Sequence, residues 1–566
     1  MRSFLTPKFV LLSVLIVAST FKASAEFSTD GLLEVRAFNH GDYKAYIPDS
    51  AWIVKAKPNY SGAACLTSVT VEHYYLEARY DAMGHFIGYD TIRYNRTYPV
   101  TAMANNAFAG SKISSFYLPG NIKFSSDLTT LGSNETPLNL SGCINLTSVT
   151  IPSRVTSVNF GGCTSLTGAT LPIGCESWNF SNTAVTNIDF LPAGITHMMG
   201  FAGNNIPIVN IPGTVKGIYD YSFKGCPISK LTIPESVEYI GDDAFLDCGE
   251  IKELVWNAKN CVHSGVGKSL QGIIDHIYAV PFKGTSFESV VVGRNVEYIG
   301  SYLLGNSGIY EGEQVIVPVK KLTWNAINCG YNQFYTRDLE QVIIGNEVQA
   351  IPSEFVWSSK ITEITIPNSV TSIGGLAFAY CSKLSTLRLN AKNIMFINNY
   401  YLNVFGGCGN LSHIIIGDEV ESISEIVGSY GLFNIGDDDN NIQTVTSYAI
   451  VPPVITAKCF TQKTYENAVL EVPAESLEAY RNAEGWKNFF KFSVIEEIPG
   501  GETDKLCGDV NGDGKVTIDD VTTLISYLLS GNVSPFDAGN ADCNGDGRVS
   551  IDDVTALINY LLTSKW

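Results

Sequence analysis

The sequence predicts a mainly β repeat solenoid of short parallel strands with few helices, followed by a small all-α module. Three observations predict this fold class. The skeleton L-x-x-[VIL]-x-I-P-x-x-V-x-x-I recurs through the middle of the 566-residue chain. Its copies follow one another at steps of 19 to 23 residues between Ile151 and Trp256, a spacing typical of solenoids. Two apolar patterns of helical period lie in the last sixty residues.

The overall composition narrows the function classes. The chain has 37 Lys and Arg against 56 Asp and Glu, which gives a net charge of −19. Such a chain repels phosphate backbones, and its composition therefore disfavours nucleic-acid binding and suits cations. The hydrophobic fraction of 45% is ample for a buried core, and 51 glycines indicate a turn-rich chain.

Residues 1–25 are typical of a secretory signal. Arg2 and Lys8 provide positive charge, Phe9–Val17 is apolar, and Ala23-Ser24-Ala25 matches a cleavage site. An uncleaved anchor is disfavoured, because a bilayer span needs about 20 apolar residues. We therefore expect a signal peptide over 1–25 and a secreted or cell-surface protein, with the periplasm as the other location.

The next regions follow from where the skeleton begins and ends. Residues 26–110 show no clean repeat and are rich in tyrosine, so we interpret them as an N-terminal cap region. Residues 111–465 hold the repeats. Each repeat alternates apolar residues and then stops at Pro or Gly, since Pro cannot donate to a strand ladder. One copy cannot bury its apolar face alone, whereas stacked copies share a continuous core.

The clearest copies are ISKLTIPESVEYIGDDAFLDC (228–248) and ITEITIPNSVTSIGGLAFAYC (361–381). They resemble the BspA-type leucine-rich repeat of secreted and surface bacterial proteins. The segment LEVPAESLEAYRNAEGWKNF (470–489) resembles the end module of such arrays. Residues 466–495 are thus expected to form a C-terminal cap with a strand and a short amphipathic helix, and 496–506 a linker. The wide gaps 257–286 and 304–338 are expected to hold insertions.

Cysteine and phenylalanine recur together at the end of the skeleton. The recurrent cysteines are Cys143, Cys163, Cys226, Cys248, Cys381 and Cys408. We predict a ladder of free buried thiols, because side chains on stacked coils run parallel, which disfavours disulfide geometry. Disulfides such as Cys143–Cys163 or Cys226–Cys248 are the alternative. The phenylalanines three positions earlier are predicted to be core residues: Phe160, Phe223, Phe245, Phe378 and Phe405.

Two 12-residue segments have the composition and spacing of calcium loops. The first set of oxygen ligands is Asp509, Asn511, Asp513, the Lys515 carbonyl, Thr517 and Asp520. The second, 33 residues later, is Asp542, Asn544, Asp546, the Arg548 carbonyl, Ser550 and Asp553. Gly514 permits the sharp turn, and Val516 is expected to point into the core. These ligand sets predict two Ca²⁺ ions.

A helix with an apolar face follows each loop, but no helix precedes the first one. The faces are Val521, Leu524, Ile525, Leu528 and Leu529, and then Val554, Leu557, Ile558, Leu561 and Leu562. Because of this loop–helix duplication, with Asp at position 12, residues 507–566 resemble a type I dockerin. The resemblance implies calcium-dependent docking to a cohesin-like protein module. Cys507 lies beside the first loop and Cys543 beside the second. They form either a disulfide or two free thiols, and the sequence leaves both alternatives open.

The resemblance also implies the residues that meet the partner. Positions 10 and 11 of each loop are Ile518-Asp519 and Ile551-Asp552, whereas the family's well-known pair is Ser-Thr. A duplicated module allows two binding orientations related by its internal two-fold. Packing of the helices on the chain's own end cap is the alternative role.

The sequence favours a binding or adhesion protein rather than an enzyme. Only about 85 residues lie outside the repeats before residue 110, too few for a catalytic domain of usual size. No nucleophile, zinc or nucleotide motif stands out. The ligand on the repeat surface, a protein or a glycan, is not encoded by the skeleton. The rival hypothesis is a component of a polysaccharide-degrading complex with glycoside hydrolase or carbohydrate-binding activity, because dockerins are typically attached to such enzymes.

Overall fold

The computed structural model describes most of the chain between residues 26 and 563. The described residues are 26–27, 33–38, 50–65, 68–80, 86–117, 123–125, 138–263, 280–300, 303, 308–310, 313–315, 317–330, 338–397, 403–426, 433, 441–456, 458–495, 507–511, 515–530, 536, 538–545 and 548–563. The expected signal peptide (1–25) and linker (496–506) lie outside them. The chain divides into two units, one of residues 1–228 and 243–249 and one of residues 229–242 and 250–566.

The first unit contains an N-terminal sheet and the first part of the repeats. Its strands are β1 (Glu26–Phe27), β2 (Leu33–Phe38), β3 (Ser50–Ala56), β4 (Ser61–Cys65), β5 (Ser68–Tyr80), β6 (Phe86–Ala104), β7 (Lys112–Tyr117), β8 (Lys123–Ser125), β9 (Leu138–Asn139), β10 (Ser148–Thr150), β11 (Ser157–Asn159), β12 (Ser177–Asn179), β13 (His197–Met198), β14 (Ile208–Asn210) and β15 (Gly217–Ile218). The N-terminal sheet has the order β1-β2-β3-β6-β5. Parallel pairing of β4 with β7 and of β7 with β10 opens the repeat stack.

The second unit contains the remaining repeats, the end cap and the C-terminal helices. Its strands are β16 (Lys230–Ile233), β17 (Tyr239–Ile240), β18 (Gly249–Trp256), β19 (Asn260–His263), β20 (Thr285–Val292), β21 (Tyr298–Ile299), β22 (Gly308–Tyr310), β23 (Glu313–Val315), β24 (Val319–Trp324), β25 (Gln341–Ile344), β26 (Ala350–Ile351), β27 (Glu363–Ile366), β28 (Ser372–Ile373), β29 (Thr386–Leu389), β30 (Asn393–Ile397), β31 (His413–Ile416), β32 (Ser422–Ile426), β33 (Thr444–Ser447), β34 (Val469–Val472) and β35 (Lys491–Val494). Its helices are α1 (Gln462–Asn467), α2 (Leu477–Asn482), α3 (Ile518–Ser530), α4 (Ala538–Ala541) and α5 (Ile551–Thr563), with 3-10 turns η1 (Ala474–Ser476) and η2 (Trp486–Asn488).

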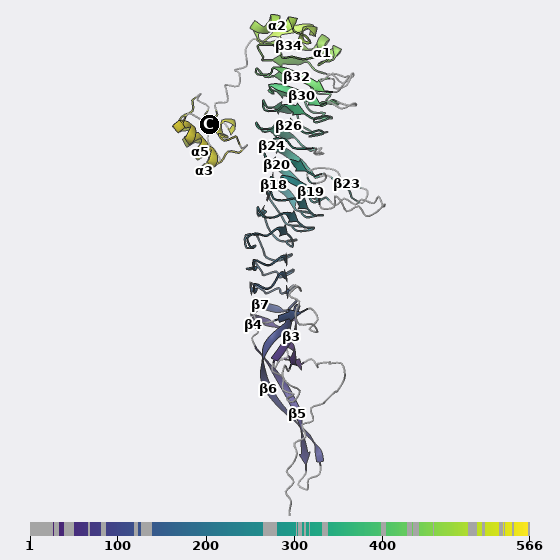
Figure 1. Ribbon diagram of the computed structural model, residues 1–566, viewed down its shortest axis with the longest axis vertical. Coiled ribbons are helices and arrows are strands. Elements are labelled where there is room, and N and C mark those ends of the chain that lie inside the picture. Colours follow the sequence, from purple (N-terminus) through teal and green to yellow (C-terminus); the bar gives the residue numbers. More distant parts are fainter. Residues whose placement is uncertain are drawn as a thin grey trace, which may run out of the picture. The chain divides into compact units, whose positions relative to one another are not determined.

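Successive coils of the second unit pair in parallel, as the skeleton predicts. One sheet has the order β16-β18-β20-β24-β25 and another β27-β29-β31-β33-β34-β35. These strands follow one another as rungs in Figure 1, with α1 and α2 covering the last ones. The end cap contains the expected strand and short helix, and Tyr480 anchors it by donating to the Ala449 carbonyl over 2.9 Å. Among the described residues, no helix combines the length and apolarity needed to cross a membrane.

The phenylalanine prediction is confirmed. All five predicted phenylalanines are fully buried. In the first unit Phe223 and Phe245 stack with ring centroids 5.4 Å apart, and in the second unit Phe378 and Phe405 stack at the same separation. Phe180 and Phe201 join the first stack. Sequence reasoning missed them, because Thr and Asn stand at the cysteine position of their coils.

The ladder cysteines are buried free thiols, as predicted. Each thiol donates to a backbone carbonyl of the preceding coil, for example from Cys226 to Phe201 over 3.1 Å and from Cys408 to Phe378 over 3.1 Å. Burial raises the pKa of the Cys226 thiol to about 11. The Cys226 sulfur is therefore a hydrogen-bonded part of the core and a poor nucleophile.

Besides the antiparallel hairpin β22–β23, the gap 304–338 holds a further rung of the repeat stack, which the skeleton did not identify. Strand β24 ends at the buried Trp324, and the parallel pairing of β24 with β20 and β25 makes it a regular rung. Its Trp324-Asn325-Ala326 repeats the Trp256-Asn257-Ala258 that ends an earlier coil, so the sequence did contain a signal for this rung.

Asparagine at this position determines which residue follows the strand in the next coil. Three coils have Asn there, namely Asn257, Asn325 and Asn390, and the next coil then has Gly293, Gly345 and Gly417. The Gly345 N–H donates to the Trp324 carbonyl over 2.8 Å, a bond that Pro would remove. A Cβ on Gly345 would lie 2.4 Å from Asn325 Oδ1. Pro would therefore lose this hydrogen bond, and any other side chain would require the Asn side chain of the preceding coil to move.

We expect Gly345→Ala to destabilise the array by about 1–3 kcal/mol, because the added methyl overpacks a filled site. Gly213→Ala is the matched control, since nothing lies within 4 Å of a Cβ there. Combining Gly345→Ala with Asn325→Gly should restore most of the loss. Urea unfolding of the four proteins checks this, and equal midpoints for the two single variants would contradict the packing argument.

Candidate metal centre and docking surface

The last module is built on two equivalent helices. α3 and α5 pack through Val521, Leu524, Val554 and Leu557, together with Val510 from the first loop. Val516 is partly buried against this core, as expected. Each helix begins at position 10 of its loop, so the last loop position lies in the first helical turn. The fold of each helix thus fixes where its position-12 carboxylate lies.

The two position-12 carboxylates close their loops in the same way. Asp520 Oδ1 accepts the Asn511 N–H over 3.0 Å and its Oδ2 accepts the Thr517 N–H over 2.8 Å. Asp553 accepts the corresponding N–H groups of Asn544 and Ser550 over 3.1 and 2.7 Å. Both carboxylates are fully buried. Positions 3, 9 and 12 of each loop are thereby brought together.

The other predicted ligands are placed less completely. Asp509 is buried and Asp542 half-buried, each at the start of its loop. Lys515 and Arg548 have exposed side chains, as expected of residues that would offer only a backbone carbonyl. Asp513, Gly514 and Asp546 lie outside the described residues. Within the part of the chain that the structure describes, no group of three or more His, Cys, Asp or Glu side chains is placed to hold a metal.

One positioning residue was missed by sequence reasoning. Asn540 on α4 donates from Nδ2 to the Asp509 carbonyl over 2.8 Å, and its own carbonyl accepts the Gly508 N–H over 2.8 Å. These bonds tie the start of the first loop to the residues just before the second loop. The short AGNA segment gave no helical pattern that could have revealed α4.

The donor set fits a hard, oxygen-preferring cation. Two fully buried carboxylates in a core this small are costly unless positive charge offsets them. The N–H bonds to Asp520 and Asp553 leave further lone pairs on their oxygens. Asp, Asn, Thr and Ser oxygens are the ligands that Ca²⁺ takes in such loops. A bound calcium ion would supply the positive charge that these carboxylates need.

Family comparisons agree with this geometry. The model of the BspA type leucine rich repeat region matches in six copies over residues 139–252, 275–390 and 320–430. The model of the dockerin type I domain matches residues 507–562. The chain is a BspA-type leucine-rich repeat protein with a C-terminal type I dockerin. Both are non-catalytic binding modules, and type I dockerins bind calcium.

Solved structures of bacterial leucine-rich repeat proteins also match. A leucine-rich repeat protein from Bacteroides ovatus has 17% identity and a TM-score of 0.35, over 69% of this chain and 94% of that one. A leucine rich cell surface protein from Faecalibacterium prausnitzii has 17% identity and a TM-score of 0.26, over 69% and 95%. The pneumococcal vaccine antigen PcpA has 12% identity and a TM-score of 0.24, over 84% and 99%. No curated protein matches the chain.

The exposed surface of the dockerin corrects the predicted apolar faces. Val521, Leu524 and their counterparts are buried, but Leu529 is 83% and Leu562 78% exposed. The apolar face that the sequence predicts for each helix thus includes residues that are not part of the buried core. Two matching apolar stripes remain on the surface, one on each helix: Ile518, Ile525 and Leu529, and Ile551, Ile558 and Leu562. Asp519 and Asp552 are exposed beside their first members.

Two cysteines meet in the dockerin core. The buried Cys543 thiol donates to the Asn540 carbonyl over 3.6 Å, and the half-buried Cys507 thiol donates to the Cys543 carbonyl over 3.8 Å. The neighbouring Cys543 side chain lowers the pKa of Cys507, while the neighbouring Cys507 side chain, together with burial, raises the pKa of Cys543. Both are free thiols in the structure. Of the two states left open by the sequence, the structure thus shows the reduced one.

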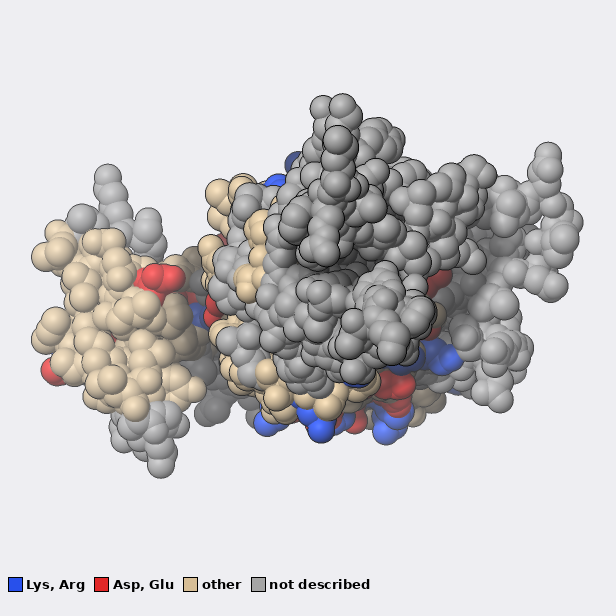
Figure 2. Space-filling model, turned by 90° about the horizontal axis from the view of Figure 1, so that it is seen from below, with Lys and Arg blue, Asp and Glu red and all other residues tan. Residues whose placement is uncertain are grey.

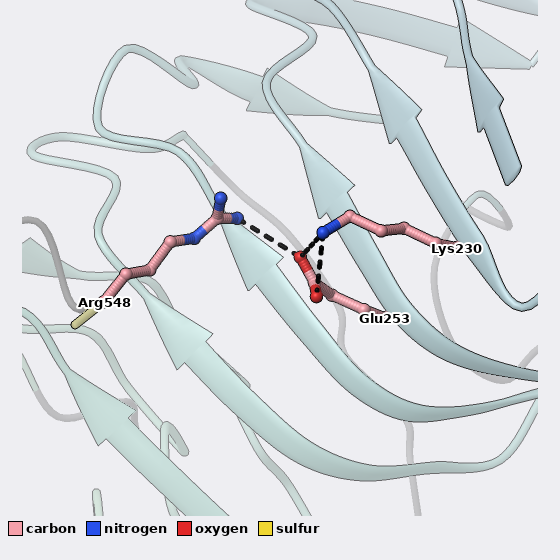
Figure 3. Close-up of polar contacts among 3 residues, drawn as sticks. All are labelled: Lys230, Glu253 and Arg548. Atoms are coloured by element: carbon pink, nitrogen blue, oxygen red, sulfur yellow. Dashed lines mark hydrogen bonds and ion pairs between the residues drawn. The ribbon is translucent and has the colours of Figure 1, made fainter. Parts of the chain in front are cut away.

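Charged side chains on the repeats are paired rather than segregated. Lys230 lies 3.2 Å from Glu253, and Glu253 Oε1 is also 3.5 Å from the guanidinium of Arg548, which belongs to the second dockerin loop (Figure 3). Figure 2 likewise shows Lys and Arg beside Asp and Glu on the visible face of the described residues. The side chains of these pairs are well exposed, and exposed pairs contribute about 0–1 kcal/mol each. They favour solubility more than stability.

Proposed function

We propose that this chain is an exported binding protein whose dockerin attaches it, in a calcium-dependent manner, to a cohesin-like module on another protein. The observation that carries the proposal is the pair of matching apolar stripes. Ile518 and Ile551 are 64% and 66% exposed, and the second members of the stripes are 37% and 38% exposed. Six large apolar side chains in solvent on so small a module are typical of a protein interface.

The duplication supports docking in either of two orientations. Each stripe begins at loop position 10 and carries an acidic neighbour, Asp519 or Asp552, at position 11. An apolar centre with a charged rim is a common interface arrangement. Because the position-12 carboxylates close the two loops with corresponding hydrogen bonds and the two stripes have similar exposures, a partner that fits one stripe also fits the other. The Ile-Asp pairs, in place of Ser-Thr, point to a partner with an apolar recess.

The ligand set of the dockerin is part of the proposal. Two calcium ions, one in each loop, would hold the first turn of α3 and α5 in place and so fix where Ile518 and Ile551 lie. The proposed ligands of the first ion are the side chains of Asp509, Asn511, Asp513, Thr517 and Asp520 and the backbone carbonyl of Lys515. The corresponding groups of the second loop are the proposed ligands of the second ion. The surface of the repeats is the proposed ligand-binding part. Residues 1–25 are the proposed signal peptide that directs export of the chain.

We expect docking to survive the loss of either stripe and to fail when both are lost. Ile518→Ala or Ile551→Ala alone should change affinity for a purified cohesin module by no more than about twofold, the statistical loss of one of two equivalent modes. The double variant should lose affinity about thirtyfold or more, since two or more kcal/mol is typical of a buried interface anchor. Surface plasmon resonance against a panel of cohesin modules, in calcium and in chelator, measures this.

Val451→Ala is the matched control, because Val451 is an apolar side chain outside the dockerin with 77% exposure. It should bind like the natural chain. Unchanged binding by the double variant would contradict the two-stripe surface. The absence of binding by the natural chain to any cohesin, with the helices shown to be folded, would contradict cohesin docking itself and favour packing on the chain's own end cap.

A further inference from the structure

The internal symmetry of the dockerin reveals an asymmetric feature. Positions 33 residues apart are equivalent in the two halves, so Cys507 corresponds to Asn540 and Cys543 to Val510. The structure retains this correspondence. Asn540 reaches the Asp509 carbonyl, and the Cys507 sulfur lies 3.9 Å from the Asp542 carbonyl. Of the two equivalent contacts between the halves, one thus pairs Asn540 with Val510 and the other pairs two thiols.

The two thiols lie next to each other. Cys507 Sγ is 3.8 Å from the Cys543 carbonyl oxygen, and both side chains lie in or against the same small core. Both contact the core formed by Val510, Val521 and Leu524. Cys543 is 6% exposed, whereas Cys507 is half-buried and so can be reached from solvent. The ladder cysteines Cys381 and Cys408 also lie in neighbouring coils, but both are fully buried.

We propose that Cys507 and Cys543 form a disulfide that ties the entrance of the first calcium loop to the start of the second. A dissolved or protein-borne disulfide is the oxidant. The Cys507 thiol loses its proton and attacks one sulfur of that disulfide, which releases one thiolate. Cys543 then attacks the mixed disulfide at Cys507 and releases the second thiolate. The two cysteines lose two electrons and two protons, and the oxidant becomes two thiols.

The location gives this bond a consequence for calcium dependence. It closes a loop that contains the whole of the first calcium loop and α3, and cross-links restrict the unfolded chain most when the closed loop is long. The reduced module depends on calcium to hold its two halves together. The oxidised module keeps its halves joined after calcium leaves, and it regains its ligand geometry without refolding.

The test uses the full chain with calcium, equilibrated in oxidised glutathione or in dithiothreitol. Mass spectrometry without reduction should find Cys507 linked to Cys543, while Cys381 and Cys408 stay free. After EDTA is added, amide exchange in α3 and α5 should be roughly a hundredfold slower in the oxidised chain. The control is Cys507→Asn with Cys543→Val, which copies the other half and should show no such difference between the redox states.

Each other outcome overturns the proposal. A glutathione adduct on Cys507 that Cys543 never resolves would show that the sulfurs cannot reach bonding geometry. No reaction at either thiol in the folded chain would show the same. A 507–543 disulfide with unchanged exchange after EDTA would rule out the coupling to calcium.

Discussion

Replacing Phe378 by Ala should destabilise the repeat array by about 3–5 kcal/mol, the usual cost of removing a buried phenylalanine. Phe378 is fully buried, stacks on Phe405 with centroids 5.4 Å apart, and meets Phe355 edge-on at 6.2 Å. Stacked coils are held rigidly by their ladders, so the cavity cannot collapse easily. Urea unfolding of the full chain, followed by tryptophan fluorescence, measures the loss.

Phe490→Ala is the matched control, since the Phe490 side chain is 70% exposed. It should change stability by less than about 0.5 kcal/mol. A loss below about 1 kcal/mol for Phe378→Ala would mean that the phenylalanine stack does not hold the coils together.

Removing calcium should unfold the dockerin and leave the repeats intact in the reduced chain. Binding at 100 times Kd adds about 2.7 kcal/mol for each independent site, which is large for a module of about 60 residues. Without the cation, the buried carboxylates of Asp520 and Asp553 lose their compensating charge. Hydrogen exchange with EDTA should show loss of protection in α3 and α5 and continued protection in β27 to β35.

The number of ions can be tested with neighbouring carboxylates. Asp520→Asn and Asp553→Asn should each lower calcium uptake from two ions to one, because each removes a closing carboxylate. Asp519→Asn and Asp552→Asn, on exposed neighbours, should leave uptake at two. Isothermal titration of the full chain distinguishes these results. No calcium uptake by the natural chain would end the calcium interpretation.

The repeat core could be predicted because its residues recur at a fixed spacing. Phe378 and Cys381 occupy the same place in their coil as Phe223 and Cys226 in theirs, and all four are buried. Equivalent positions in different copies of a repeat have the same environment, so a pattern seen in one copy can be verified in the others. The calcium loops were predictable for a related reason, since ligand spacing within twelve residues is fixed by the coordination of the ion.

Features that depend on contacts between different segments could not be predicted. Leu529 continues the helical apolar period, and only the packing of α3 against α5 shows that it faces solvent. Asn540 lies in a segment without a pattern, and its role comes from the approach of α4 to the first loop. The coil that ends at Trp324 is a different case, because its Trp324-Asn325-Ala326 matches Trp256-Asn257-Ala258 and could have been recognised.

The close approach of Asn in one coil to Gly in the next coil means that these two coils are matched to each other. A coil with Asn after its strand is followed in all three cases by a coil with Gly, so the two form a matched couple. Recombination that separated them would place Asn beneath Pro and create a steric clash in a chain that still contains only good repeats. Gain or loss of coils is therefore tolerated in couples, and array length in this part of the chain is expected to vary by about 40 to 60 residues rather than by single repeats of roughly 20.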